Sequence, residues 1–491
     1  MVNIVADLAE RAARSGWLDR AAVHTAERTW THGQVHESAA RASTVLADHG
    51  VRPGDHVVLA LPDGIGWITA FLATAALGAR AVLVNPDLTA DGHRFIVDDC
   101  KAALVVTTAE RAGGFDGTAV LDIGTLMTAA EHARATGPRS LDPDACLYVQ
   151  YTSGTTGVPK GVPHRHRDVA VYASAVGEEV LRIGPDDVGL SLSKLFYAYG
   201  FGNAFAIPLF TGSSVVLLGD RQTPGAVREA VARRGVTVLY AVPSAYANLI
   251  SSGDPAVFAT VRAAVSAGEN LGPGLGRRIS DFLSAPVLDQ LGSTEVGHAF
   301  CANGVEFCRP GTIGRAVPGY RLEVRDGSGS PVADEVEGDL WVSGPTVLAE
   351  YLNRPQDTAR TLVDGWLATH DRVVRGKDGA YRHVGRDDDM EMVGGVTVSP
   401  LEVEAVLDDH QAVKEVGVAV LADARGITQL HAFVVPGDPA GRSDALPAEL
   451  VALARGRLAP HKVPRVVHLV DALPRTPNGK LRRHILRSGK W

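Results

Sequence analysis

A run of hydroxyl side chains, glycines and one lysine follows an apolar segment and has the composition of an anion-binding loop. The apolar segment, residues 146–150, reads as a strand. Glycines let backbone N–H groups approach an anion, hydroxyls add donors, and Lys160 adds a positive charge. The loop predicts polyphosphate binding rather than an ordinary surface turn, and the residues expected to contact the phosphates are Thr152, Ser153, Gly154, Thr155, Thr156, Gly157 and Lys160.

The loop does not match the Walker A pattern, which requires glycine, lysine and then serine or threonine in direct succession. Here Pro159 precedes Lys160 and Gly161 follows it. The order of residues therefore disfavours a P-loop ATPase or kinase.

A second transition from strand to loop carries a carboxylate. Gly292, Ser293, Thr294 and Glu295 follow the apolar residues 287–291. A carboxylate at such an edge can hold Mg²⁺ that bridges phosphate oxygens. Taken alone, the segment also fits a polar turn that opens the next helix.

The elements that position these groups point to an α/β fold. Residues 57–61, 81–84 and 103–106 are apolar runs without strict alternation, as expected for strands buried on both faces. Amphipathic stretches between them favour βαβ units and parallel sheets flanked by helices. Between residues 311 and 345 the apolar residues alternate, which predicts an antiparallel β unit.

At 491 residues the chain is long enough for two to four structural units. The charged run beside glycine at 385–389 predicts a boundary between a large N-terminal domain, 1–386, and a small α+β C-terminal domain, 387–491, although many such runs are only solvated turns. Beyond it, Ser399 is expected to be a helix N-cap, with Pro400 at the first helical position and Glu402 completing a capping box.

Composition excludes several classes of protein. A net charge of −8 offers no global basic field for nucleic acid. Four cysteines without metal spacing suggest free thiols in a reducing cytoplasm. The N-terminal residues do not read as a signal peptide, and residues 67–84 read as a buried helix running into a strand rather than a membrane span. We expect a cytoplasmic protein without a membrane or nucleic-acid partner, either a monomer or a homodimer.

Together these motifs resemble the adenylate-forming superfamily, which includes acyl- and aryl-CoA ligases, adenylation domains and beetle luciferase. The resemblance covers nearly the whole chain and implies binding of ATP and Mg²⁺. It assigns Glu295 to the metal and Thr294 to the phosphates, and it places Asp371 and Arg386 at the ribose. The remaining residues implied for ATP are Gly268, Glu269 and Asp289.

Two positions depart from the family pattern. His370 stands where the family usually has glycine, just before Asp371. Leu291 occupies the place of an aromatic residue that often stacks on adenine. These changes could tilt the ribose contact or weaken stacking, with apolar packing as compensation.

The resemblance also implies the catalytic residue and the second half of the reaction. Lys480, in the segment 474–480, would bridge the acid carboxylate and the α-phosphate and stabilise the negative charge of the transition state. Rotation about Asp388 would then remove this lysine. Gly394 and Gly395 would line a channel for the thiol of coenzyme A or of a carrier protein's phosphopantetheine.

Residues 194–203 contain four aromatics near glycines and resemble the benzoate-CoA ligase branch, although an aromatic core segment has the same composition. The resemblance implies a small aromatic acid as substrate. The pocket residues that it suggests are Ala198, Tyr199, Gly200, Gly268, Gly292 and His298.

The expected reaction is formation of an aryl adenylate from ATP, followed by transfer to CoA. Three alternatives remain open on the sequence. The acceptor can be a carrier protein or another nucleophile, the chain can be a luciferase-type oxidoreductase, or it can be a nucleotide-binding protein without catalysis.

Overall fold

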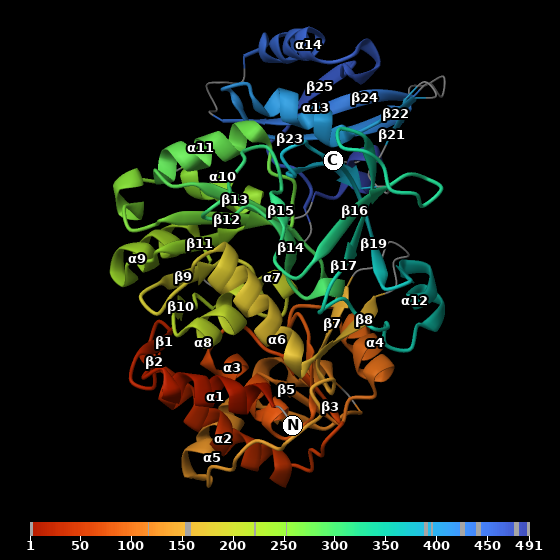
Figure 1. Cartoon of the computed structure of the whole chain (residues 1–491). Helices are drawn as coiled ribbons and strands as arrows, with labels where there is room; N and C mark the ends of the chain where they lie inside the picture. Colours follow the sequence, from red (N-terminus) through yellow and green to blue (C-terminus); the bar gives the residue numbers. More distant parts are fainter. Residues whose placement is uncertain are drawn as a thin grey trace.

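The computed structural model describes residues 3–115, 117–152, 159–219, 222–251, 253–386, 391–393, 396–422, 428–437, 443–475 and 481–488. All structural statements refer to these ranges. The fold is mixed α/β, as predicted, with its larger N-terminal part at the bottom and centre of Figure 1 and a smaller C-terminal part at the top.

A six-stranded sheet carries the candidate phosphate loop. The strands are parallel except for the last pair, an antiparallel connection between β7 and β8. In spatial order the strands are β6 (Val120–Asp122), β5 (Leu104–Thr107), β3 (His56–Ala60), β4 (Arg80–Leu83), β7 (Cys146–Thr152) and β8 (Lys160–Arg165). The apolar runs predicted as buried parallel strands are β3, β4 and β5.

A nine-stranded sheet carries the candidate metal loop. Its central strands are parallel, and antiparallel strands border them on both sides. In spatial order the strands are β15 (Arg315–Ala316), β14 (Ala299–Ala302), β13 (Val287–Gly292), β12 (Ala263–Ala267), β11 (Val238–Ala241), β9 (Val188–Ser191), β10 (Ser214–Val216), β1 (Ala21–His24) and β2 (Thr29–Thr31).

The predicted antiparallel β unit is a five-stranded sheet whose neighbouring strands all run in opposite directions. Its strands are β16 (Arg321–Arg325), β17 (Glu337–Ser343), β18 (Leu362–Val363), β19 (Trp366–Arg375) and β20 (Tyr381–Arg386). Helix α12 (Pro355–Thr361) lies at one end of this sheet (Figure 1).

The C-terminal part has its own sheet and apolar core. Strands β23 (Val413–Ala422) and β24 (Thr428–Pro436) pair antiparallel, and β25 (Val466–Leu469) joins β24 in parallel. The two-stranded pair β21 (Glu391–Val393) and β22 (Val396–Val398) precedes them. Its helices are α13 (Pro400–Asp408), α14 (Leu446–Arg457) and α15 (Arg483–Arg487). The boundary at residue 386 stays a prediction.

The helices of the larger part cover its sheets. They are α1 (Ile4–Arg14), α2 (His32–Asp48), α3 (Ile65–Ala76), α4 (Ala90–Cys100), α5 (Ile123–His132), α6 (His166–Tyr172), α7 (Ala198–Phe201), α8 (Ile207–Thr211), α9 (Pro224–Arg234), α10 (Pro243–Ile250) and α11 (Pro273–Leu283). Residues 67–84 form most of α3 and then β4, as predicted. Ten of the twelve α3 residues are buried, since the helix packs inside the core.

One of the two hydrogen bonds of the capping box predicted at Ser399 forms. The Ser399 hydroxyl accepts the Glu402 N–H at 3.4 Å and donates to the Val384 carbonyl. The Glu402 carboxylate instead pairs with Lys462 at 2.5 Å, so the side chain that would complete the box is taken by a cation of the same part.

The smaller part contacts the larger one through α11. Asp408 accepts the Leu275 N–H at 2.8 Å and pairs with Arg278 at 3.1 Å, while Asp409 pairs with Arg277 at 2.5 Å. These contacts place the C-terminal domain beside α10 and α11 (Figure 1).

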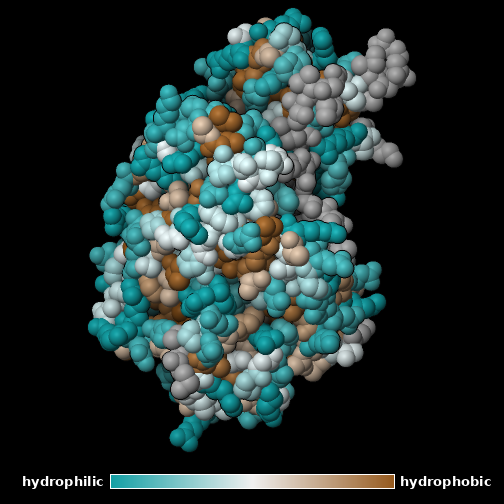
Figure 2. All heavy atoms as spheres, turned by 45° about the vertical axis from the view of Figure 1, so that its right-hand side comes forward, coloured by the Kyte–Doolittle hydropathy of each residue, from teal (hydrophilic) through white to brown (hydrophobic). Residues whose placement is uncertain are grey.

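Hydrophilic residues predominate on the face in Figure 2, with hydrophobic residues in separate smaller areas. The exposed large hydrophobic residues come from distant parts of the chain: Leu18, Leu88, Val305, Val336, Val363 and Val466. Among the described helices none has both the length and the apolar character needed to cross a membrane.

Candidate active site

Several predicted site residues lie outside the described ranges. They are Ser153, Gly154, Thr155, Thr156 and Gly157 of the phosphate loop, the hinge residue Asp388, Gly394 and Gly395 of the thiol channel, and the catalytic Lys480. The roles predicted for them stay predictions.

The two strands that flank the phosphate loop bring its ends together. Thr152 ends β7 and pairs directly with Lys160, the first residue of β8. The Lys160 ammonium lies 3.3 Å from a carboxylate oxygen of Asp357 and 5.3 Å from the centre of the Tyr351 ring. Its side chain is only 13% exposed, so its charge is held in a fixed place at the mouth of the loop.

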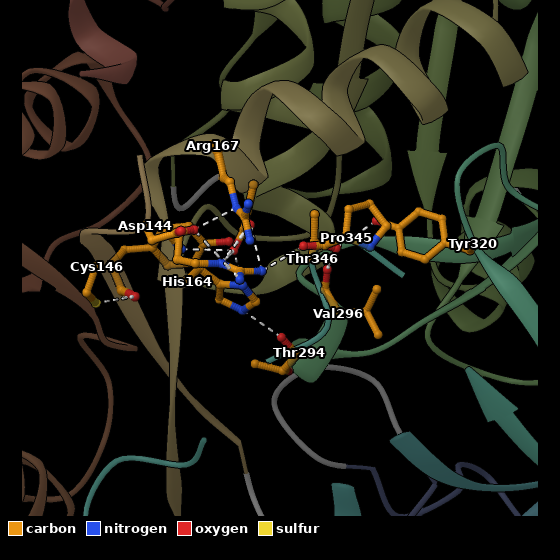
Figure 3. Close-up of polar contacts among 12 residues, drawn as sticks. Asp144, Cys146, His164, Arg167, Thr294, Val296, Tyr320, Pro345 and Thr346 are labelled. Atoms are coloured by element: carbon orange, nitrogen blue, oxygen red, sulfur yellow. Dashed lines mark hydrogen bonds and ion pairs between the residues drawn. The ribbon is translucent and has the colours of Figure 1, made fainter. Parts of the chain in front are cut away.

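The backbone of Thr294, Glu295 and Val296 forms a short 3₁₀ turn that three donors hold in place. The Thr294 carbonyl accepts from His164 Nε2 at 2.8 Å, and the Val296 carbonyl accepts from the Thr346 hydroxyl at 2.6 Å (Figure 3). The Glu295 carbonyl accepts the Leu348 N–H at 2.8 Å. Because a carbonyl can only accept, His164 carries its proton on Nε2.

A buried ion pair supports His164 from behind. Asp168 lies 3.8 Å from His164 Nδ1 and 3.1 Å from Arg165. Burial would raise the pKa of Asp168, but the nearby His164 ring and the hydrogen bonds and charge of Arg165 hold it below its usual value. Arg165 also donates to the Pro345 carbonyl at 2.7 Å, which ties β8 to the segment that carries Thr346 (Figure 3).

The Glu295 side chain suits a hard cation. The Tyr351 hydroxyl donates to Glu295 Oε1 at 2.9 Å. A carboxylate has two oxygens with several lone pairs, so this bond leaves room for a metal ligand. Glu295 therefore fits the predicted Mg²⁺ site, where it would hold the ion next to the phosphates.

The predicted ribose residues come together on two adjacent strands. Asp371 of β19 is buried and lies 3.1 Å from His383 Nε2 and 3.8 Å from Arg386, with both partners on β20. Burial would raise the pKa of Asp371, but His383 and Arg386 hold it below its usual value. An ionised carboxylate can accept two hydrogen bonds from a cis-diol.

The departure at His370 has a backbone reason. His370 has φ 61°, in the left-handed region that glycine favours, and its side chain is exposed. Histidine is among the residues that tolerate this region. The histidine is therefore compatible with the backbone that precedes Asp371, whose carboxylate keeps its contacts with His383 and Arg386.

Glu269 meets both parts of the chain. It accepts from the Ser244 N–H at 3.0 Å and the Ser244 hydroxyl at 2.9 Å, at the start of α10. Arg475 of the smaller part approaches it at 3.4 Å. Burial raises the pKa of Glu269, although Arg475 and Ser244 act against this. Neighbouring Gly268 has φ 87°, which a glycine adopts without strain.

Asp289 contributes an unsatisfied group. Its Oδ1 is buried without a hydrogen-bond partner among the described residues, and burial raises its pKa well above the usual value. Ser266, the residue opposite it on β12, acts against this rise in pKa and has a buried hydroxyl. Two adjacent strands thus present polar atoms that a ligand could satisfy.

His298 lies in an apolar, aromatic surrounding. Its ring stacks against Tyr172 with centroids 5.7 Å apart, and Tyr199 is 6.2 Å away. Its Nε2 contacts Asn203 Oδ1 at 3.2 Å, while His298 Nδ1 and Asn203 Nδ2 are buried without partners among the described residues. Burial lowers the pKa of His298 to about 4, so the ring is neutral at physiological pH.

The Tyr199 hydroxyl is hydrogen-bonded within the fold. This hydroxyl donates to the Val265 carbonyl at 2.9 Å, so its proton is already used. Ala198 and Gly200 lie with it in α7. Two aromatics of the same run, Phe196 and Phe201, are buried in the core, where the competing core interpretation applies to them.

Glycines in this region make room for the backbone and for His298. A Cβ on Gly200 would lie 2.0 Å from the Lys194 carbonyl oxygen, and one on Gly292 would lie 2.7 Å from the His298 carbonyl oxygen. A Cβ on Gly202 would lie 2.0 Å from the His298 ring. Gly202 is therefore a further determinant of where this ring sits.

Sequence reasoning missed the residues that support the predicted ones: His164, Asn203, Tyr351, Asp357 and His383. Most of them act across a long sequence separation, whereas His383 contacts Asp371 across the neighbouring strands β19 and β20, and Asn203 closes the aromatic run 194–203. His164 follows the phosphate loop in β8, so its position was the only signal that could have drawn attention to it.

Comparisons with known proteins agree with this geometry. The family of AMP-binding enzymes matches residues 8–352, and the C-terminal domain of AMP-binding enzymes matches residues 402–480. The chain belongs to this family of adenylate-forming, ATP-binding enzymes.

Its relatives include aryl-acid ligases. A p-hydroxybenzoic acid–AMP ligase, FadD22 of Mycobacterium tuberculosis (strain ATCC 25618 / H37Rv), is 40% identical across 99% of this chain and 68% of that protein. A benzoate–CoA ligase of Thauera aromatica is 34% identical across 98% of this chain and 94% of that protein. The recognition of the benzoate-CoA ligase branch is confirmed.

Solved structures show the same fold. The anthranilate CoA ligase AuaEII in complex with anthranoyl-AMP has a TM-score of 0.94 and 30% identity, covering 99% of this chain and 97% of that one. A benzoate CoA ligase from Burkholderia xenovorans LB400 has a TM-score of 0.91 and 32% identity, covering 99% and 100%.

Proposed function

We propose that this enzyme activates a small aromatic carboxylic acid of the benzoate type as an aroyl adenylate and then transfers the aroyl group to the thiol of CoA. The single observation that carries the substrate class is the buried, neutral His298 between Tyr172 and Tyr199. A flat, apolar surrounding with one polar edge suits an aromatic ring. The names of the relatives above support the same class.

In the first half-reaction the acid carboxylate would attack the α-phosphate of ATP, and pyrophosphate would leave. Lys160 and Thr294 would bind the phosphates, and Asp371 would hold the ribose hydroxyls. A Mg²⁺ ion held by Glu295 would neutralise phosphate charge. The enzyme would contribute mainly positioning and electrostatic stabilisation, with Lys480 supplying charge at the reacting groups.

In the second half-reaction a thiol would attack the adenylate carbonyl and release AMP. We propose that residues 387–491 rotate about Asp388 between the halves, bringing Gly394 and Gly395 to the thiol channel. A cytoplasmic location follows from the use of ATP and CoA.

A second candidate function is transfer to a carrier protein or another nucleophile. It is supported by the p-hydroxybenzoic acid–AMP ligase, whose name contains AMP rather than CoA and whose own length exceeds the matched region. Both kinds of acceptor can present the same phosphopantetheine thiol.

The test is acid-dependent pyrophosphate release across benzoates, cinnamates and fatty acids, each with and without CoA. We expect release with one or more aryl acids, increased by CoA, and a thioester product. Release that ignores CoA would favour the second candidate. Turnover of fatty acids alone would contradict the aryl substrate.

A further inference from the structure

Lys160 and Glu295 each have a side-chain partner from the same short segment, residues 351–357. Lys160 pairs with Asp357 at 3.3 Å, and Glu295 accepts from the Tyr351 hydroxyl at 2.9 Å. The Lys160 ammonium also lies over the Tyr351 ring, 5.3 Å from its centre. Two opposite charges of the phosphate site thus converge on one tyrosine, one at its face and one at its hydroxyl.

This segment, residues 351–357, which we call the strap, is held in place by contacts that involve neither Lys160 nor Glu295. Leu352 N–H donates to the Gly161 carbonyl at 2.8 Å, directly after Lys160 in β8. Tyr351 N–H donates to the Thr358 hydroxyl at 2.9 Å. Arg354 pairs at 3.1 Å with Asp99, which also accepts from the Tyr151 hydroxyl at 2.8 Å. The strap is therefore anchored to both strands that flank the phosphate loop.

Without the strap, the side chains of Lys160 and Glu295 could form an ion pair with each other. Lysine is a point charge on a flexible stem, and it pairs with a carboxylate wherever one is within reach. In a partly buried site such a pair is stronger than at the surface. A Lys160–Glu295 pair would occupy both the cation meant for phosphate and the carboxylate meant for metal.

We propose that Tyr351, which lies between Lys160 and Glu295, keeps these two charges apart before ATP binds, and that Asp357 stands in for the phosphate that later takes its place on Lys160. Tyr351 stays on Glu295 throughout and is a positioning residue for the metal ligand. This inference rests on the proposed function, because it assumes that Lys160 meets a phosphate.

The two strap residues should respond to substitution with opposite signs. Removing the Asp357 carboxylate removes a competitor for Lys160, so phosphate should bind more tightly. Removing the Tyr351 hydroxyl frees Glu295 to move, so the contribution of Mg²⁺ should fall. Damage to the fold would weaken both kinds of binding together.

The first experiment titrates inorganic pyrophosphate into the full chain by calorimetry. We expect Asp357→Asn to lower the dissociation constant about threefold to fivefold, as for the loss of a partly exposed competing ion pair. Asp364→Asn is the matched control, since Asp364 is exposed, lies just beyond α12 and does not contact Lys160. It should leave the constant unchanged. If the Asn variant is poorly folded, Asp357→Gln replaces it, because glutamine is a good helix former and carries no charge.

The second experiment titrates ATP with and without Mg²⁺. Tyr351→Phe should leave Mg²⁺-free binding unchanged and reduce the gain in affinity on adding Mg²⁺ by about tenfold, as for a lost hydrogen bond to a charged group. Tyr381→Phe is the control, since its hydroxyl faces the Leu322 carbonyl at 3.4 Å in the antiparallel sheet.

Unchanged or weaker pyrophosphate binding in Asp357→Asn overturns the stand-in role. Equal loss with and without Mg²⁺ in Tyr351→Phe overturns the positioning role. Both results leave the proposed function standing as long as the wild type binds ATP and pyrophosphate. A wild type that binds neither would overturn the proposed function itself.

Discussion

The phosphate end and the acid end of the candidate site satisfy their polar groups in different ways. At the phosphate end, Lys160, Glu295 and Asp371 each have a side-chain partner of opposite or complementary character. At the acid end, His298 and Asn203 contact each other but leave one buried nitrogen each without a partner among the described residues.

The difference corresponds to two kinds of ligand. Paired, partly exposed charges can exchange one ionic partner for another at small net cost, which suits a polyphosphate. Buried, neutral and incompletely bonded groups are costly without a ligand, so they favour a neutral ring that brings a polar substituent or a water molecule with it. The comparison predicts that changes at one end should leave binding at the other end intact.

The largest effect is expected at the metal ligand. Glu295→Gln keeps the shape of the side chain but removes its charge, so acid-dependent pyrophosphate release should fall on the order of a hundredfold or more. The dissociation constant of the aromatic acid should stay within a factor of two. Glu350→Gln, an exposed carboxylate in the same connection, is the control. Equal weakening of acid binding would break the separation of the two ends.

The next effect is expected at the acid end. Gly202→Ala puts a methyl group where its carbon would lie 2.0 Å from the His298 ring, so the ring must move. Overpacking of this kind costs about 1–3 kcal/mol, which corresponds to about fivefold to a hundredfold in KM for the acid.

Steady-state kinetics with the best acid would check the Gly202→Ala prediction, with KM for ATP expected to stay the same. Gly137→Ala, at a position with no heavy atom within 4 Å of the added carbon, is the control. An unchanged acid KM would show that His298 does not line the pocket.

At the phosphate end, the sequence predicted one residue of each interacting pair but not its partner. Lys160 and Glu295 stand beside strand ends in recognisable motifs, and the family resemblance added Asp371, which lies within β19. Their partners Asp357, Tyr351 and His383 reach the site through the strap and through β20. Contacts between segments so far apart follow from the packing of whole sheets, which local patterns do not encode.

Local sequence patterns have the same limit at the acid end. The sequence around Tyr199 shows aromatics near glycines, but it does not predict that the Tyr199 hydroxyl donates to the Val265 carbonyl on β12. Nor could it tell which glycine accommodates His298. The left-handed backbone at His370 was likewise invisible, because histidine has no strong turn signature.

A smaller effect concerns the charge of His298. Its pKa is lowered by burial to about 4, whereas an unfolded chain has the ordinary value near 6.5. The unfolded state therefore binds more protons between these values, so stability is highest above pH 6.5 and falls as the pH drops toward 4. Replacing His298 by leucine should reduce this pH-dependent loss by roughly 2–3 kcal/mol.

Denaturant unfolding of the His298→Leu variant and the wild type at pH 7.5 and pH 4.5 would measure that difference. His132→Leu, at the end of α5, is a control that should behave as the wild type does. Equal pH dependence in the wild type and His298→Leu would mean that His298 takes up its proton without cost, and the acid end would then be more hydrated than its packing indicates.

The smallest effect is expected where Arg475 of the smaller part contacts Glu269 of the larger part. Arg475 pairs with Glu415 of its own sheet at 2.8 Å and with Glu269 of the larger part at 3.4 Å. Arg475→Met keeps the length of the side chain but leaves Glu269 without this cation. Because the longer contact is weak and partly exposed, we expect the adenylation rate to fall only about twofold to fourfold. KM for ATP and for the acid should not change, since neither end loses a contact to its ligand.

Rapid-quench measurement of adenylate formation would show this, with Arg465→Met as a control on the same part. A more than tenfold fall in the adenylation rate, or a change in only one of the two KM values, would mean that the orientation of the smaller part affects ligand binding at one end of the site rather than at both.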